Sequence, residues 1–146
     1  MNLGEQFPDD LKKEFAGRSV KIGSVIKLHV YDTTPPKEKR VVLMGRSFDK
    51  FSFASIYINT DPPPKYLLKQ HEFFDSTGRD YLDHDSYIDC SDLHIIDARA
   101  LILHVEQNPG TVLGELEDQD YKTLREKIKT AKTISNDDKK KFGLFL

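Results

Sequence analysis

Cysteine is almost absent from this sequence: the chain of 146 residues contains a single one, Cys90. A lone cysteine cannot form an internal disulfide, and it makes a structural zinc site improbable. We therefore expect a reducing compartment, the cytoplasm. No apolar run reaches the length of a membrane span, and the first residues, MNLGEQFPDD, have neither the basic start nor the apolar stretch of a signal peptide. The sequence thus predicts no contact with a membrane.

Glycine-rich loops are also missing, because the eight glycines are scattered along the chain. This excludes the loops that cradle nucleotide phosphates, and we predict no cofactor and no bound metal. The net charge of −2 provides no broad field that would attract nucleic acid. Charge is nevertheless segregated, since residues 72–97 carry eight acids and one base whereas residues 122–141 carry eight bases and three acids. Local patches of either sign can therefore attract a partner.

The residues that are present are typical of one compact, β-rich domain. Alternating apolar and polar residues predict strands at 24–31, 40–47, 51–59, 65–70 and 86–90, and a hairpin at 101–117 around the turn NPG. Helical spacing and end signals predict helices at 8–17, 118–132 and 136–142. The predicted fold is mainly β with terminal helices (α+β): one domain over 1–146, with a small antiparallel barrel at about 22–116.

The stretch HDSYIDCSDLH has the densest group of reactive side chains in the sequence. In a strand, Ile88 and Cys90 would point into the core, whereas Asp85 and Asp89 would lie on the solvated face. A buried Cys90 is then a core residue and not a nucleophile. A magnesium site formed by Asp83, Asp85 and Asp89 is a remote alternative, because hard cations favour carboxylate oxygens.

The first predicted hairpin loop, TTPPKEKR, is the best phosphate-binding candidate in the sequence. It projects Lys37, Lys39 and Arg40, and Arg46 follows on the next strand. The simpler interpretation is a soluble hairpin tip, in which these cations only solvate the loop.

The order of elements resembles that of the PemK/MazF-like toxin family, small SH3-like barrels that cut single-stranded RNA. The resemblance extends over residues 22–132. It lies in the strand RVVLMG after a polar loop, the strand end IYINT, the pair YIDC and HIID, and LGELEDQDYKTLREKI entering a helix. It implies an SH3-like antiparallel barrel.

Cleavage of RNA without a metal uses the ribose 2′-hydroxyl as nucleophile, so it requires a base, an acid and a cation near the phosphate. The resemblance places Arg40 as the basic residue that closes the first loop. Asp89 and Ser91 stand where the family has an arginine and an acidic residue, and Pro35 and Pro36 replace the expected loop glycine. The resemblance thus implies an endoribonuclease with a degenerate or rearranged active site.

The site residues follow from this resemblance. The catalytic candidates are Arg40 as the cation and His84 or Asp85 as the base. The RNA-binding candidates are Lys37, Lys39, Arg46, Asn59, Thr60 and Asp89.

The expected partners are single-stranded RNA, a small antitoxin-like protein and a second copy of the chain in a homodimer. Two other hypotheses remain open: a non-catalytic SH3-like barrel that acts as a protein-binding module, and a metal-dependent nuclease centred on Asp83, Asp85 and Asp89.

Overall fold

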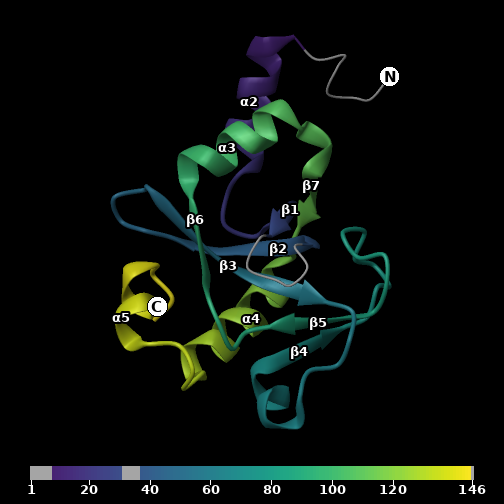
Figure 1. Ribbon diagram of the computed structural model, residues 1–146, viewed down its shortest axis with the longest axis vertical. Helices are drawn as coiled ribbons and strands as arrows, with labels where there is room; N and C mark the ends of the chain where they lie inside the picture. The colour runs from purple at the N-terminus through teal and green to yellow at the C-terminus, as the bar shows by residue number, and fades with distance from the viewer. Residues whose placement is uncertain (1–7, 31–36, 146) are drawn as a thin grey trace.

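The computed structural model describes residues 8–30 and 37–145, and for Val30 and Lys37 it describes the backbone only (Figure 1). The strands are β1 (Ser24–Val30), β2 (Lys37–Arg46), β3 (Ser52–Asn59), β4 (His71–Phe74), β5 (Ser86–Asp89), β6 (His94–Asp97) and β7 (Val112–Glu115). The helices are α2 (Asp9–Ser19), α3 (Ala98–Gln107), α4 (Asp118–Thr130) and α5 (Asn136–Lys141), with short 3-10 helices η1 (Lys65–Gln70) and η2 (Pro109–Thr111).

The described strands form one curled, antiparallel sheet. The strand order is β4-β5-β3-β2-β1-β7, and β6 also pairs with β3. The two ends of this order, β4 and β7, do not pair with each other, so the barrel is only half closed. This architecture confirms the predicted mainly β, antiparallel, barrel-like α+β fold.

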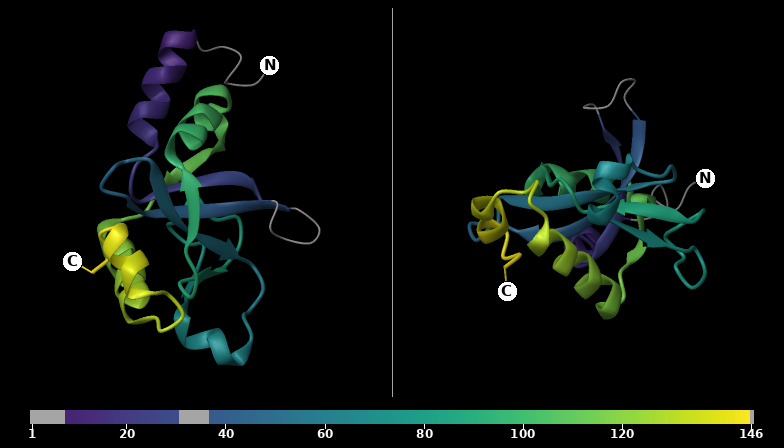
Figure 2. Two further views of the ribbon diagram at one scale, coloured as in Figure 1. Left: turned by 60° about the vertical axis from the view of Figure 1, so that its left-hand side comes forward. Right: turned by 90° about the horizontal axis from the view of Figure 1, so that it is seen from below.

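Helices cover both faces of the sheet (Figure 2). Successive strand residues point to opposite faces, so Val41 and Val42 are both fully buried, one in each core. Helices α2 and α3 cover one core, and α4 with the C-terminal segment covers the other (Figure 2). Burial on both sides explains why β2 contains a continuous apolar run in place of strict alternation.

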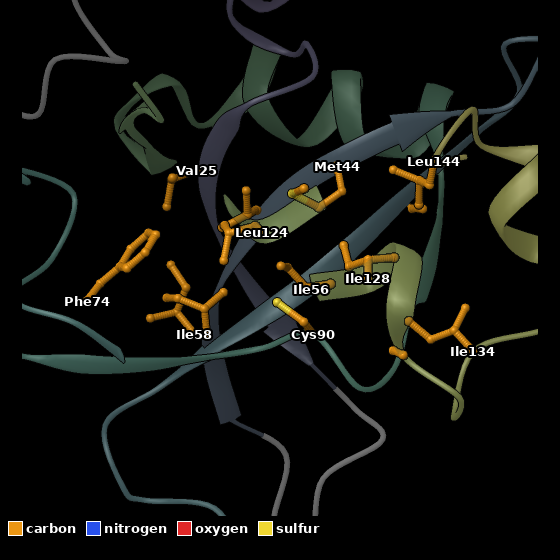
Figure 3. Close-up of a cluster of buried hydrophobic side chains, with 14 of the residues drawn as sticks. Val25, Met44, Ile56, Ile58, Phe74, Cys90, Leu124, Ile128, Ile134 and Leu144 are labelled. Carbon is orange, nitrogen blue, oxygen red and sulfur yellow. The ribbon is translucent and has the colours of Figure 1, made fainter. Parts of the chain in front are cut away.

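The larger core lies between the sheet and α4 (Figure 3). Leu124 and Ile128, four residues apart on one face of α4, are both fully buried there. Tyr121 packs at its rim and donates a hydrogen bond from its hydroxyl to the Met44 carbonyl at 2.8 Å. The predicted helix at 118–132 is therefore confirmed as a core element, although it ends at Thr130 and its N-cap is Glu117.

The segment at 101–107 is not a strand of a hairpin, as the sequence analysis expected, but most of helix α3. Its buried residues Ala98, Leu101 and Val105 follow helical spacing. The Asp97 side chain caps the helix by accepting a hydrogen bond from the Ala100 amide at 2.8 Å. Strand β7 then pairs with β1, and the NPG turn becomes part of η2.

Three smaller predictions were also wrong. The segment at 65–70 is the 3-10 helix η1 and not a strand, and strand β4 follows it at 71–74, where no strand was predicted. Helix α2 does not stop at Gly17 but continues to Ser19.

The short helix α5 matches its prediction, since the Ser135 side chain caps it and Gly143 follows at a φ of +71°. None of the described helices is long and apolar enough to cross a membrane.

Cys90 should react very slowly with a thiol reagent in the native protein. The side chain is fully buried in the core beneath α4 (Figure 3), and burial raises the pKa of its thiol. Burial keeps the reagent away from the sulfur, and the raised pKa lowers the fraction of reactive thiolate. Labelling can be followed by absorbance with a chromogenic disulfide reagent, and denaturant should make it complete within the mixing time. Rapid labelling without denaturant would contradict the inward register of Ile88 and Cys90.

Candidate functional site

A cavity of about 590 Å³ lies where β2 and β3 approach the proline-rich loop after β3. We call it the arginine cavity. Its lining residues come from β1, β2, β3, β4, β5, η1 and that loop: Lys27, Glu38, Lys39, Arg40, Ile58, Asn59, Thr60, Asp61, Pro62, Pro63, Pro64, Leu67, His71, Ser86 and Asp89.

Strand register brings the first of these side chains together. Lys27 on β1 is the partner of Arg40 on β2, and Arg40 is the partner of Ile58 on β3. Cross-strand partners share a face of the sheet, so two cations from different strands project on the same side. The loop of Pro62, Pro63 and Pro64 forms part of the wall, and its fixed backbone makes that wall stiff.

Arg40 lines the cavity together with two lysines, Lys27 and Lys39. Its side chain is mostly buried, and its guanidinium donates a hydrogen bond to the exposed carboxylate of Asp83. This hydrogen bond and the charge of Arg40 hold the pKa of Asp83 below its usual value. An incoming phosphate would therefore compete with a solvent-exposed carboxylate and not with a buried one.

Other polar groups also line the arginine cavity, among them Lys39, which points to the opposite face of β2 from Arg40. The Lys39 ammonium donates to the Asn59 side-chain oxygen at 2.5 Å, which leaves the Asn59 amide group as a donor. Lys27 pairs with Glu38 at 3.2 Å, and both of these side chains are solvent-accessible. Thr60 is exposed at the edge of the cavity. Together these groups provide donors suited to the oxygens of a phosphate.

Asp89 is not the freely solvated carboxylate that its strand register predicted. Its Oδ1 accepts hydrogen bonds from the Ser91 amide at 2.9 Å and from the Ser91 hydroxyl, and it lies 3.4 Å from Nε2 of His71. Its Oδ2 has no partner within residues 8–30 and 37–145. The side chain is only 20% exposed. The structure thus provides a braced carboxylate with one oxygen available.

His71 is the functional candidate that the sequence analysis missed. Its side chain is 4% exposed, and its Nδ1 lies 2.9 Å from the Leu67 carbonyl. The other ring nitrogen, Nε2, faces Asp89, so both ring nitrogens lie next to oxygen atoms of the protein. The ring therefore positions Asp89 and has no nitrogen left for a substrate. No local sequence signal marks His71, because its contact with Asp89 depends on the pairing of β4 with β5.

Two of the predicted catalytic residues lie outside the lining of the arginine cavity. The Asp85 carboxylate accepts hydrogen bonds from the amide and hydroxyl of Ser76, at 2.9 and 3.2 Å. His84 is exposed in the same loop. The cavity therefore brings together Arg40 and Asp89, but not the two side chains expected to act as the base.

Only some of the predicted RNA-binding residues line the arginine cavity. Lys39, Asn59, Thr60 and Asp89 line the arginine cavity. Arg46 lies near the opposite end of β2, where its Nε donates to the Lys50 carbonyl at 3.1 Å. The side chain of Lys37 lies outside the described part of the chain, as do Pro35 and Pro36.

The magnesium site proposed for Asp83, Asp85 and Asp89 does not form. Their carboxylates contact three different partners, which are Arg40, Ser76 and the pair of His71 and Ser91. Across the described residues, no three histidine, cysteine, aspartate or glutamate side chains are grouped so that they could hold a metal ion.

The cavity lining combines the donors of Lys39, Arg40 and Asn59 with the carboxylate of Asp89. Such groups have the chemistry to bind a phosphate and to accept a proton. No protein-family model matches this chain, and a search of curated proteins finds no match either.

Proposed function

We propose that this protein is a metal-independent endoribonuclease of the PemK/MazF-like type, which cleaves single-stranded RNA in the arginine cavity. The observation that supports the proposal is that Arg40, Lys39 and Asn59 line the same cavity as the braced carboxylate of Asp89. The first three bind and orient the phosphate, and Asp89 serves as the base. This assignment replaces His84 and Asp85, which lie outside the cavity lining.

The proposed reaction is an internal transfer of the phosphate. The ribose 2′-oxygen forms a bond to phosphorus while the bond from phosphorus to the 5′-oxygen breaks. The proton of the 2′-hydroxyl passes to Oδ2 of Asp89, and the 5′-oxygen takes a proton from the Lys39 ammonium or from water. The guanidinium of Arg40 balances the charge that develops on the phosphate oxygens. The products are a 2′,3′-cyclic phosphate and a 5′-hydroxyl.

The test is a cleavage assay with a single-stranded RNA that carries a fluorophore and a quencher. We expect cleavage that persists with a chelator, a cyclic phosphate on the upstream product, and no cleavage of the matched 2′-deoxy strand. Loss of activity with chelator would indicate a metal-dependent nuclease. The absence of cleavage under all conditions would overturn the ribonuclease proposal.

Replacing Asp83 with asparagine should strengthen the binding of single-stranded RNA. The change removes the carboxylate that pairs with Arg40 and so frees a cation for one more phosphate. The dependence of log affinity on log salt should steepen by about 0.7. Fluorescence anisotropy with a labelled, non-cleavable RNA at several salt concentrations measures both effects.

Asp80→Asn is the matched control for this variant, because Asp80 is an exposed carboxylate of the same loop for which no partner is seen among the described residues. It removes the same charge without changing Arg40. Equal effects of the two substitutions would mean that general charge repulsion, and not release of Arg40, controls binding.

The proposal extends to the partners and the compartment. It places the protein in the cytoplasm, where RNA is abundant, and includes inhibition by a small antitoxin-like protein. Expression of the wild type should then arrest growth, whereas expression of Arg40→Ala should not. Growth arrest by both proteins would show that toxicity does not come from the arginine cavity.

A second candidate function, a non-catalytic barrel that binds a protein, has one observation in its favour. Phe48 and Phe51, in the connection between β2 and β3, are 82% and 72% exposed. Aromatic side chains of this size are enriched at protein interfaces. The partner that we propose for this surface is a second copy of the chain, which would form the homodimer. Light scattering should show a dimer for the wild type and a monomer for the double variant Phe48→Ser and Phe51→Ser.

A further inference from the structure

A second cavity, of about 700 Å³, lies between the sheet, strand β6 and helix α3. We call it the histidine cavity. It is lined by Leu28, His29, Val41, Tyr57, Leu93, His94, Ile95, Ile96, Asp97, Ala100, Leu101 and His104. Its size falls in the range of roughly 300–1,000 Å³ that is usual for small-molecule sites. None of the residues proposed for RNA cleavage lines it.

The walls of the histidine cavity are aromatic and aliphatic. The rings of Tyr57 and His94 are stacked, with their centroids 3.5 Å apart and their planes within 4° of each other. Ile95, on the same strand as His94, is 50% exposed although it is a large apolar residue. Flat heteroaromatic rings bind well to such surfaces, since they stack on aromatic side chains and pack against aliphatic ones.

His104 adds a polar group to these walls. Its Nε2 lies 3.3 Å from the Lys27 carbonyl, which can only accept a hydrogen bond. In the neutral ring, Nε2 then carries the proton and Nδ1 is an acceptor. Nδ1 has no hydrogen-bond partner within the part of the chain that the structure describes. It can accept a hydrogen bond from an N–H group on the edge of a nucleobase.

The two cavities approach each other at Lys39 and Asn59. Leu28, Val41 and Tyr57 line the histidine cavity, whereas their sequence neighbours in the arginine cavity point to the opposite face of the sheet. Lys39 and Asn59 also line the arginine cavity, and by strand register they lie on the face of Leu28 and Tyr57. Lys39 connects the two sites, because its ammonium bonds to Asn59 and also lies 5.9 Å from the centroid of the Tyr57 ring. A strand whose phosphate is held by Lys39 and Asn59 therefore has an adjoining site for a base.

We propose that the histidine cavity binds one nucleobase of the RNA whose phosphate occupies the arginine cavity. The base stacks beside Tyr57 and His94 and donates a hydrogen bond to His104. This inference rests on the proposed function, because it requires the same single-stranded RNA. It adds a base-binding site to a phosphate-binding site, so binding should depend on the bases and not on the backbone alone.

The experiment compares the binding of two labelled, 2′-O-methylated hexamers, which cannot be cleaved by attack of the 2′-oxygen. One hexamer carries bases and the other is abasic. For the wild type, we expect the hexamer with bases to bind roughly 5- to 150-fold more tightly, as stacking of one base contributes. His94→Ala should remove most of this difference without changing the affinity for the abasic hexamer.

Three further variants test the assignment. His94→Phe keeps a flat ring and should retain the preference for bases. His104→Leu should reduce that preference while the abasic affinity stays the same. Arg40→Ala should weaken both hexamers alike. Circular dichroism confirms that each variant is folded.

The possible failures can be distinguished. Equal binding of the two hexamers by the wild type would overturn the base-binding site and leave the phosphate site of the proposed function intact. If His94→Ala and His104→Leu both keep the full preference for bases, the base binds elsewhere and the inference is wrong. If the wild type binds neither hexamer, the proposed function fails and the base-binding site fails with it.

Discussion

Replacing Arg40 with alanine should lower the rate of RNA cleavage by about 10²–10³-fold, the usual effect of losing one preorganised charge donor. The guanidinium lies in the arginine cavity together with Lys39 and Asn59, and its neutralising partner is an exposed carboxylate that substrate can displace. Arg46→Ala is the matched control, because it removes an arginine from the same strand but from outside the cavity. It should cleave RNA at the rate of the wild type.

Asp89→Asn tests the other half of the same mechanism. Asparagine keeps an oxygen that can accept the hydrogen bonds from Ser91, but it cannot take a proton from the 2′-hydroxyl. We expect a fall in turnover with little change in RNA affinity, whereas Arg40→Ala should impair both. If Asp89→Asn cleaves at the rate of the wild type, another group is the base and the assignment of Asp89 is wrong.

Leu124→Ala should lower the free energy of unfolding by about 2–5 kcal/mol, the range measured when a buried leucine is truncated. Leu124 is fully buried between α4 and the sheet, in the core that also contains Ile128 and Cys90 (Figure 3). The well-packed surroundings cannot collapse fully into the space that the lost methyl groups leave. Unfolding in urea, followed by circular dichroism, measures the change.

Lys122→Ala is the control for this substitution, because Lys122 is exposed on the same helix. Its helix propensity is close to that of alanine, so its removal should change the free energy of unfolding by less than about 0.5 kcal/mol. A similarly small effect of Leu124→Ala would mean that α4 does not contribute to the core.

The regular elements with a clear local pattern could be predicted from the sequence. The inward register of Ile88 and Cys90 followed from alternation along one strand, and both side chains are fully buried. Helix α4 followed from the spacing of Leu124 and Ile128, since residues four apart share a face of a helix. These features depend on neighbours along the chain, which the sequence displays directly.

The error at 101–107 has a different cause. Leu101, Leu103 and Val105 fit the alternation of a strand, whereas Ala98, Leu101 and Val105 fit a helix. Packing decided between the two patterns, because α3 buries the second set against the face of the sheet that it shares with α2. A short apolar segment does not by itself indicate which of its two possible faces will find a partner.

In the candidate site, too, the sequence predicted some features and tertiary packing decided others. The sequence by itself determined which side chains have suitable chemistry, and Lys39, Arg40, Asn59, Thr60 and Asp89 were all among those predicted. Only the tertiary structure decided that Asp89 is braced by His71, that Arg40 pairs with Asp83, and that His84 and Asp85 lie outside the cavity lining. His71 and Asp89 meet because they are register partners on β4 and β5. Such contacts depend on how distant strands pair, and strand pairing is set by burial of the whole sheet and not by local sequence.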